Sequence, residues 1–284
     1  RSCHAQPANA AGRHRNPCNF SLEAGFTGGG TLQWSVENNM GVLVDYVDAF
    51  SDIQALGGHA GIDHFEISGT TTLDSIDTGT GDNVVNVSDR VRIKSIRAGD
   101  GADTVALDGD AHVSVIQTDA GEDRVVLTGR ASAGEIQTGA DNDHVSLADT
   151  ASARWIQTGT GDDTITLAGN STVDEPIDGG EHSSVGDHLD LSNYQESLNL
   201  NPSAGSIGEF TYLDIERITA PSGFDNTLQG PSNSANTWTI TGENSGTLES
   251  ESGFFLSFVQ ITRLLGGDVA DHFILADGGI TGEI

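Results

Sequence analysis

Apolar residues recur along the middle of the chain with a period of 20 residues. Each copy opens with an isoleucine, and two more apolar positions follow nine and eleven residues later. The opening residues are Ile76, Ile96, Ile116, Ile136 and Ile156. Positions two residues apart lie on one face of a strand, and a fixed period of this length is typical of solenoids. The pattern predicts an all-β, elongated parallel β-solenoid, β-helix-like or β-roll-like, with about 20 residues per coil.

A weaker apolar pair lies 15 and 17 residues after each isoleucine and predicts a third wall. It is a pair of alanines in two copies, Ala131 with Ala133 and Ala151 with Ala153. We therefore expect three short strands per coil and a flattened cross-section. One coil buries about five apolar side chains, worth roughly 1.5–3 kcal/mol each. Ordering its backbone costs about 1–2 kcal/mol per residue, so single coils must stack on neighbours to be stable.

The turn after each isoleucine has glycine at the third and at the fifth position in four of the five copies, and aspartate at the seventh position in four of the five. The glycines that matter here are Gly99, Gly101, Gly121, Gly159 and Gly161, and the seventh position holds Asn83, Asp103, Asp123, Asp143 and Asp163. Stacking places successive carboxylates about 4.8 Å apart, where two charges repel by roughly 3–4 kcal/mol at an effective dielectric of 20. A column of aspartates therefore favours a cation. Glycines let carbonyl oxygens turn toward the same point, and Ca²⁺ prefers such oxygen ligands.

Two of these turns carry a resemblance to a known family. The segments 158–166 (TGTGDDTIT) and 98–106 (AGDGADTVA) resemble the nonapeptide GGxGxDxUx of repeats-in-toxin proteins, which form calcium-binding β-rolls. The resemblance implies a single column of Ca²⁺ along one edge, with the aspartate giving a side-chain oxygen and the loop backbone the rest. Asn83, Asp119 and Asp141 depart from the pattern. In the alternative interpretation, each aspartate accepts backbone N–H bonds within its turn and no metal is bound.

A second kind of unit flanks the regular coils. Residues 31–67 and 238–273 share the order Trp, Asn-x-Gly-x-Leu, aromatic-x-x-Ile-x-x-Leu, Gly-Gly, Asp-His-Phe. With the segments 236–242 and 214–218, this unit resembles modules of very large bacterial surface and adhesin-like proteins. Its turn aspartates, Asp63 and Asp271, join the candidate calcium ligands.

These patterns predict a short extension followed by one long domain. Residues 1–30 form the extension and 31–284 a single solenoid, with regular coils over 76–175 and irregular coils over 31–75 and 176–284. A disulfide between Cys3 and Cys18 would close a loop of about 15 residues, worth roughly 3 kcal/mol, and fits an oxidising, extracellular location. A zinc site made of both cysteines with His4 and His14 is the alternative.

Composition narrows the range of partners. The 284 residues carry a net charge of −30, with Lys94 the single lysine. Such a chain repels nucleic acid and anionic membrane surfaces and attracts divalent cations. No apolar run approaches the length of a membrane span. We therefore expect neither nucleic-acid binding nor membrane insertion.

Aromatic and histidine residues offer two further sites, each with a plainer interpretation. The aromatics Trp34, Phe50, Trp238 and Phe258 could form a sugar-binding platform or fill the wider parts of the solenoid. The histidines His64, His144, His188 and His272 could ligate a transition metal or lie on the outer, solvated face of a strand. We favour core packing for the aromatics and surface positions for the histidines.

The function predicted from these features is structural and not enzymatic. We expect a secreted, extracellular or cell-surface protein, either a calcium-rigidified spacer of a bacterial adhesin or a subunit of a head-to-tail filament. Because residues 271–284 have the pattern of the start of another coil, the expected partner is a second copy end to end, or the continuation of a longer chain, with cell-surface glycans as a further ligand class. One alternative is a carbohydrate-active β-helix enzyme or accessory module, which requires acid and base groups gathered in a cleft. The other is an ice-binding solenoid, which requires flat, uncharged rows of side chains.

Overall fold

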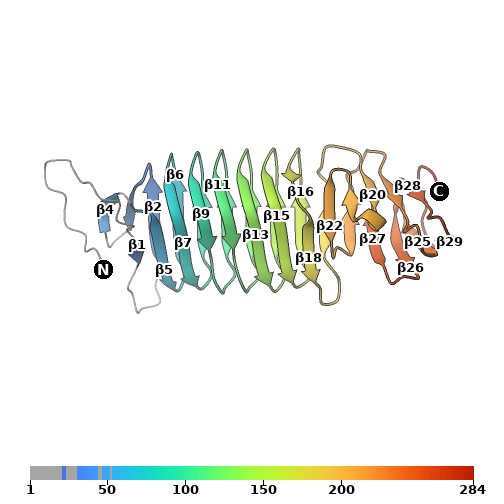
Figure 1. The fold of residues 1–284 in the computed structure, drawn as a ribbon, viewed down its shortest axis with the longest axis horizontal. Coiled ribbons are helices and arrows are strands. Elements are labelled where there is room, and N and C mark those ends of the chain that lie inside the picture. The colour runs from blue at the N-terminus through green and yellow to red at the C-terminus, as the bar shows by residue number, and fades with distance from the viewer. Residues whose placement is uncertain (1–20, 24–30, 44–46, 52) are drawn as a thin grey trace.

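In the computed structural model, the chain is a rod of stacked β-coils (Figure 1). The structure describes residues 21–23, 31–43, 47–51 and 53–284. The predicted disulfide between Cys3 and Cys18 and its zinc alternative lie outside these residues. Apart from one 3-10 turn, η1 (Pro202–Ala204), the regular elements of the described residues are strands. None of the helical structure in that part of the chain is long and apolar enough to cross a membrane. The predicted parallel β-solenoid is confirmed.

Two long sheets run the length of the rod, and each regular coil gives one strand to each. The first sheet contains β7 (Thr72–Thr80), β9 (Arg92–Arg97), β11 (His112–Gln117), β13 (Ser132–Ala140) and β15 (Ser152–Thr160). The second sheet contains β8 (Val84–Val87), β10 (Thr104–Leu107), β12 (Arg124–Leu127), β14 (His144–Leu147) and β16 (Thr164–Leu167). All these pairs are parallel and shifted by one 20-residue period, as in Ile116 with Ile136 and Val105 with Val125. Equivalent residues of successive coils therefore lie directly above one another.

The prediction of a third, separate strand in each coil is wrong. Ala133 and Ile136 both lie on β13 and both are buried, although three residues separate them. The ladder between β13 and β15 passes from Ala133 to Glu135 without a pair at Gly134. A local bend at this point turns both apolar positions inward, so that the small wall and the next isoleucine share one strand. Each coil is therefore two strands and two turns, which gives the narrow interior.

The two flanking units adopt the same arrangement, as their shared sequence predicts. The first contains β2 (Leu32–Glu37), β3 (Met40–Leu43), β4 (Val47–Ser51), β5 (Ala55–Ala60) and β6 (Asp63–Ser68). The second contains β25 (Asn236–Gly242), β26 (Ser245–Ser250), β27 (Phe255–Val259), β28 (Arg263–Leu265) and β29 (Asp271–Leu275). In each unit three strands form an antiparallel meander in the second sheet, and the last strand pairs in parallel with the first.

The tryptophans of these units fill the core. Trp34 stacks on Phe65 with ring centroids 5.7 Å apart, and Trp238 stacks on Phe273 at 5.4 Å. Both tryptophans and Phe258 are at most 1% exposed. The interpretation of these three residues as core is confirmed, and a sugar-binding platform made from them is excluded by their burial. The side chain of Phe50 lies outside the described part of the structure.

Irregular coils connect the regular repeat to the second unit without interrupting the second sheet. β19 (His188–Asp190) pairs with β16 and with β23 (Arg217–Thr219), which in turn pairs with β27. The remaining strands are β1 (Ser21–Glu23), β17 (Thr172–Val173), β18 (Ile177–Glu181), β20 (Asn199–Asn201), β21 (Ser206–Ile207), β22 (Phe210–Leu213) and β24 (Thr227–Gln229). β1 pairs with β5, so the solenoid already includes residues that the sequence assigned to the extension.

Candidate metal centre: a column of buried carboxylates

The turns between the two sheets have the backbone that the glycine pattern requires. The φ angles are 86° at Gly99, 143° at Gly101, 136° at Gly121, 111° at Gly159 and 150° at Gly161. A Cβ atom on Gly99 would overlap the carbonyl oxygen of Gly79 in the preceding coil. Only glycine combines this φ with such close stacking.

Two turns that depart from the glycine pattern keep the same backbone. Asp119 and Asp141 stand where other coils have glycine, and their φ angles are 68° and 78°. Aspartate tolerates this left-handed region better than most residues. The departures in sequence therefore do not break the stack.

The turn aspartates point into the solenoid and form a continuous column. Asp103, Asp123, Asp143 and Asp163 each precede a strand of the second sheet and are only 1–2% exposed. In each, the Oδ1 atom accepts the backbone N–H of the equivalent residue in the preceding coil, at N–O distances of 2.7–2.8 Å. These are the hydrogen bonds that the metal-free interpretation requires.

Asp187 continues the column, and the sequence analysis missed it. The coil that contains it has an enlarged loop, so Asp187 lies 24 residues after Asp163 instead of 20. Its Oδ1 atom accepts the N–H of Asp163 at 2.7 Å, and the residue is 0% exposed. The Asp at the start of the segment 187–189 (DHL), before an apolar strand, was the available signal. We call Asp103, Asp123, Asp143, Asp163 and Asp187 the carboxylate column.

The second oxygen of each column carboxylate is buried without a partner. Within the described residues, the Oδ2 atoms of all five have no hydrogen bond. A buried acceptor left in this way costs about 1–3 kcal/mol, and more when it is charged. Removal from water raises the pKa of Asp103 and Asp143 to about 7, and that of Asp123 and Asp187 to about 6. Neighbouring carboxylates raise these pKa values further. A cation or a bound proton beside each Oδ2 atom would therefore stabilise the column.

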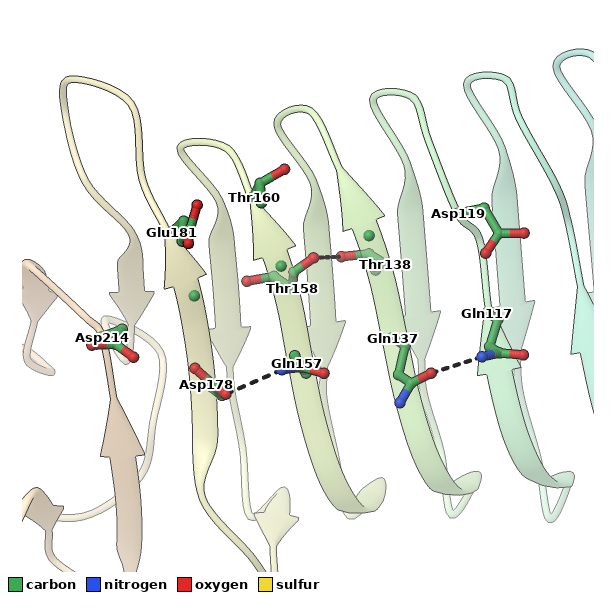
Figure 2. Close-up of a pocket in the computed structure, with 13 residues that line it drawn as sticks. Gln117, Asp119, Gln137, Thr138, Gln157, Thr158, Thr160, Asp178, Glu181 and Asp214 are labelled. Carbon is green, nitrogen blue, oxygen red and sulfur yellow. Dashed lines mark hydrogen bonds between the residues drawn. The ribbon is translucent and has the colours of Figure 1, made fainter.

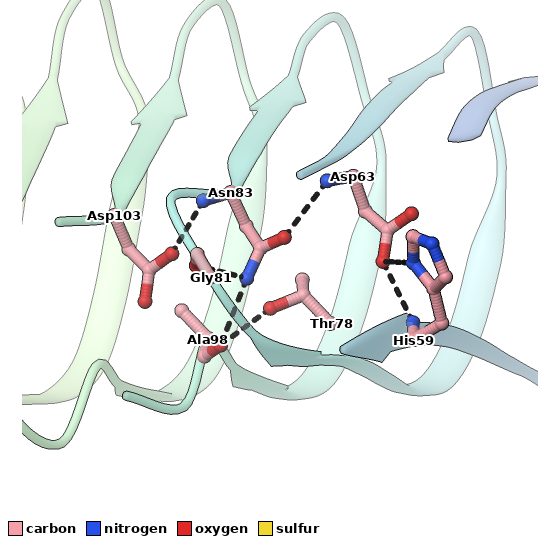
Figure 3. A network of polar contacts seen from close by, with 7 residues as sticks. All are labelled: His59, Asp63, Thr78, Gly81, Asn83, Ala98 and Asp103. Carbon is pink, nitrogen blue, oxygen red and sulfur yellow. Dashed lines mark hydrogen bonds and ion pairs between the residues drawn. The ribbon is translucent and has the colours of Figure 1, made fainter. Parts of the chain in front are cut away.

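Asn83 shows what surrounds this oxygen (Figure 3). Its Oδ1 accepts the N–H of Asp63 at 2.9 Å, as the aspartates do for their neighbours. Its Nδ2 donates to the carbonyl oxygens of Gly81 at 2.7 Å and Ala98 at 3.3 Å. Since the coils stack in register, each column Oδ2 takes the place of this amide nitrogen. A carboxylate oxygen at this place would face backbone carbonyl oxygens, which are also acceptors.

Asn226 repeats the arrangement in the irregular coils. Its Oδ1 accepts the N–H of Leu198 at 3.0 Å, and its Nδ2 donates to the carbonyl oxygens of Pro221 at 2.7 Å and Gln260 at 2.9 Å. Two asparagines of the chain thus satisfy, with their own N–H groups, the surroundings that the column aspartates leave unsatisfied.

Buried threonine hydroxyls complete the oxygen-rich surroundings. Thr118, Thr138 and Thr158 are 0% exposed, and each hydroxyl lies close to a carbonyl of the next coil, at 3.1, 3.0 and 2.8 Å. Each hydroxyl also lies near the carboxylate of its own coil and lowers the pKa of that carboxylate, against the larger effect of burial. Carboxylate, carbonyl and hydroxyl oxygens are the ligands of a hard cation such as Ca²⁺. The residues present therefore fit calcium.

In the described part of the chain, no group of three or more His, Cys, Asp or Glu side chains is placed to hold a metal ion. A cation at the column would instead draw on one or two carboxylates together with backbone carbonyl and threonine oxygens. The glycines Gly101, Gly121 and Gly161 belong to the same turns and leave the space for those carbonyls.

The two outer candidates, Asp63 and Asp271, have donors of their own. The Oδ2 atom of Asp63 accepts the N–H of His59 at 2.7 Å and lies 3.0 Å from His59 Nδ1, while its Oδ1 has no partner among the described residues. Asp271 accepts from Asn236 Nδ2 at 2.6 Å and from the N–H of Gly267 at 2.7 Å. The sequence analysis grouped Asp63 and Asp271 with the other candidate calcium ligands. In the structure their surroundings differ from those of the carboxylate column, because each accepts hydrogen bonds from donors within its own unit.

The four candidate histidines lie on separate strands of the second sheet and do not meet. His144 pairs with Arg124 and Thr164, and His188 pairs with Thr164 and Arg217. Burial lowers the pKa of both, and nearby arginines lower it further. His64 lies near the start of β6 and His272 near the start of β29, and these two strands are far apart along the rod (Figure 1). All four lie on the outer face of their strands, where His272 is exposed and the other three are half-buried.

Fold and site together define a parallel β-solenoid repeat protein with an internal column of carboxylates. The chain matches no family model, and comparison with curated proteins and with solved structures also finds no match.

Proposed function

We propose that the chain is an extracellular structural rod in which Ca²⁺ neutralises the carboxylate column. In this role it is a spacer of a bacterial adhesin or a subunit of a surface filament, with no catalytic activity. The observation that carries the proposal is the row of five buried carboxylate oxygens that have no hydrogen-bond partner among the residues the structure describes. Each lies where Asn83 needs two N–H groups to satisfy the same surroundings.

The end of the second unit supports end-to-end assembly. β29 corresponds to β6, whose outer edge pairs with β8. Leu275 of β29 is 62% exposed, whereas the corresponding Ile67 of β6 is 1% exposed because the next coil covers it. An unpaired edge with exposed apolar side chains favours a further strand, supplied by a second copy or by a longer chain. We expect calcium-dependent oligomers in sedimentation velocity at high concentration; a monomer under those conditions would remove the filament from the proposal and leave the spacer.

Thermal unfolding of the whole chain, with Ca²⁺ or with a chelator, tests the metal. A ligand that binds only the folded state stabilises it by about 2.7 kcal/mol at 100 times its Kd. We expect the midpoint to rise with Ca²⁺ concentration and to rise much less with Mg²⁺, which demands a stricter octahedral geometry. The matched variant replaces Asp103, Asp123, Asp143, Asp163 and Asp187 by asparagine and should lose the response. An unchanged midpoint in the unsubstituted protein would reject the calcium role.

A further inference from the structure

A groove runs across the outer face of the first sheet, at the end of the regular repeat (Figure 2). A row of side chains from successive coils lines it, namely Gln117, Gln137, Gln157 and Asp178. The amide of Gln117 donates to Gln137 at 2.8 Å, and that of Gln157 donates to Asp178 at 3.3 Å. The groove has a volume of about 620 Å³. These bonds hold the polar groups in a line, one strand spacing apart.

Glycine makes the groove possible. Two residues beyond the polar row, on the same face of the strands, stand Gly139, Gly159 and Gly180. Because these positions carry no side chains, backbone forms the floor there. A ligand can therefore lie against the sheet beside the amide row.

Trp155 lies on the same outer face, two residues before Gln157 on β15. It is partly exposed, whereas the other two tryptophans of the chain, Trp34 and Trp238, are at most 1% exposed. The position holds Val115 and Glu135 in the two preceding coils, so the solenoid does not require an aromatic residue there. Trp155 is not among the residues that line the groove; it lies beside the polar row, and a partly exposed indole at this place can offer a ring for stacking.

The charges of the groove restrict its ligand. Its lining includes the carboxylates of Asp119, Asp178, Glu181 and Asp214, and no described lysine or arginine lines it. Burial, and the carboxylate of Asp214, raise the pKa of Asp178, whose Oδ1 is buried with no partner among the described residues. Such a surface repels polyanions. Its carboxylates accept hydrogen bonds from hydroxyls, and its amides both donate and accept.

We propose that this groove binds an extended, uncharged glycan. The apolar face of one sugar ring stacks on Trp155, and the hydroxyls of neighbouring rings bond to Gln137, Gln157 and Asp178. Pockets of this kind combine an apolar contact with a few placed polar groups that fix orientation. The groove shares Thr138, Thr158 and Gly159 with the turns that border the carboxylate column. The proposed contacts with Trp155, Gln137, Gln157 and Asp178 involve no column carboxylate, so the glycan proposal does not depend on calcium.

Isothermal titration of the whole chain with uncharged hexasaccharides (cellohexaose, laminarihexaose and mannohexaose) tests this site. We expect one of them to bind and to change the fluorescence of Trp155. Trp155→Ala should weaken binding by about tenfold or more, since tryptophan contacts are commonly dominant, while Trp155→Phe keeps a platform and most of the affinity. Gln137→Ala should weaken binding less.

Val126→Ala is the matched control, because Val126 lies on the outer face of the second sheet, away from the groove. All variants should melt within a few degrees of the unsubstituted protein, so that loss of binding is not loss of fold. The proposal is overturned if none of the three hexasaccharides binds at millimolar concentration, or if Trp155→Ala binds as well as the control. Binding of oligogalacturonate alone, and only with Ca²⁺, would also overturn it, because that result assigns the groove to a polyanion bridged by metal.

Discussion

Replacing one column carboxylate by an amide should make the metal-free rod more stable. In Asp143→Asn, the Oδ1 atom can still accept the N–H of Asp123, which lies 2.8 Å from Asp143 Oδ1. The new Nδ2 takes the place of the unpartnered Oδ2 and can donate to carbonyl oxygens, as Asn83 does. The substitution therefore removes a buried acceptor and adds two donors without a change of shape.

The magnitude follows from the pKa of Asp143, which burial raises from 3.8 to about 7. Each pKa unit corresponds to about 1.4 kcal/mol, so keeping this side chain ionised in the fold at pH 8 costs at most about 4 kcal/mol. A net hydrogen bond adds about 1 kcal/mol, whereas relaxation around the charge reduces the first figure. We expect Asp143→Asn to raise the free energy of unfolding by about 2–4 kcal/mol at pH 8 in chelator.

Urea unfolding followed by far-ultraviolet circular dichroism, in chelator and in excess Ca²⁺, measures the effect. Asp100→Asn removes the same charge from an exposed position in a neighbouring turn and should change stability by less than about 0.5 kcal/mol. In excess Ca²⁺ the order should reverse, because the variant lacks one anionic ligand. The reasoning is refuted if Asp143→Asn destabilises the metal-free rod, or if Asp100→Asn stabilises it equally.

Three other outcomes are expected. Gly99→Ala should lose about 3 kcal/mol or more, because its Cβ meets a carbonyl oxygen, whereas Gly253→Ala, with φ 92° and open space, should lose only about 1 kcal/mol; equal losses in urea unfolding would contradict the stacking argument. In chelator, stability should fall as pH rises from 4 to 8, because the raised pKa values near 6 to 7 mean that the folded column binds more protons than the unfolded chain; a urea midpoint that rises over this range would show the opposite sign. Asp162→Ala should free the loop over residues 183–186, because Asp162 accepts hydrogen bonds from the four N–H groups of this loop at 3.0–3.2 Å. Proteinase K should then cut the loop faster than it does in the control Asp82→Ala, since Asp82 accepts a single N–H. Equal cutting rates would show that Asp162 does not hold the loop.

The period and the turn chemistry were predictable because both repeat. Five copies without insertion place Ile116 on Ile136, as found, and glycines at two fixed positions required the observed left-handed backbone. The flanking units were predictable for the same reason, since a shared order of residues gave a shared order of strands. When a pattern recurs within one chain, each copy is independent support for the interpretation of the others.

The features that could not be predicted depend on the direction that the backbone or a side chain takes, which the sequence pattern does not specify. A three-residue spacing between Ala133 and Ile136 reads as two separate strands, and only a bend in the backbone makes it one. The inward direction of the aspartates is another case. An aspartate in a glycine-rich turn has the same sequence whether it faces solvent or the interior. Asp187 was missed because an enlarged loop shifts it out of period, and Trp155 because one aromatic residue on an outer face leaves no pattern.

The bonds between coils through the carboxylate column all run one way. The N–H of one coil is always satisfied by a side chain that comes later in the chain, from Asn83 bonding to Asp103 as far as Asp163 bonding to Asp187. A chain that emerges with its N-terminus first therefore always has one turn waiting for the residue some twenty positions behind it. Each turn of the column is therefore complete only when the coil that follows it in the chain is in place.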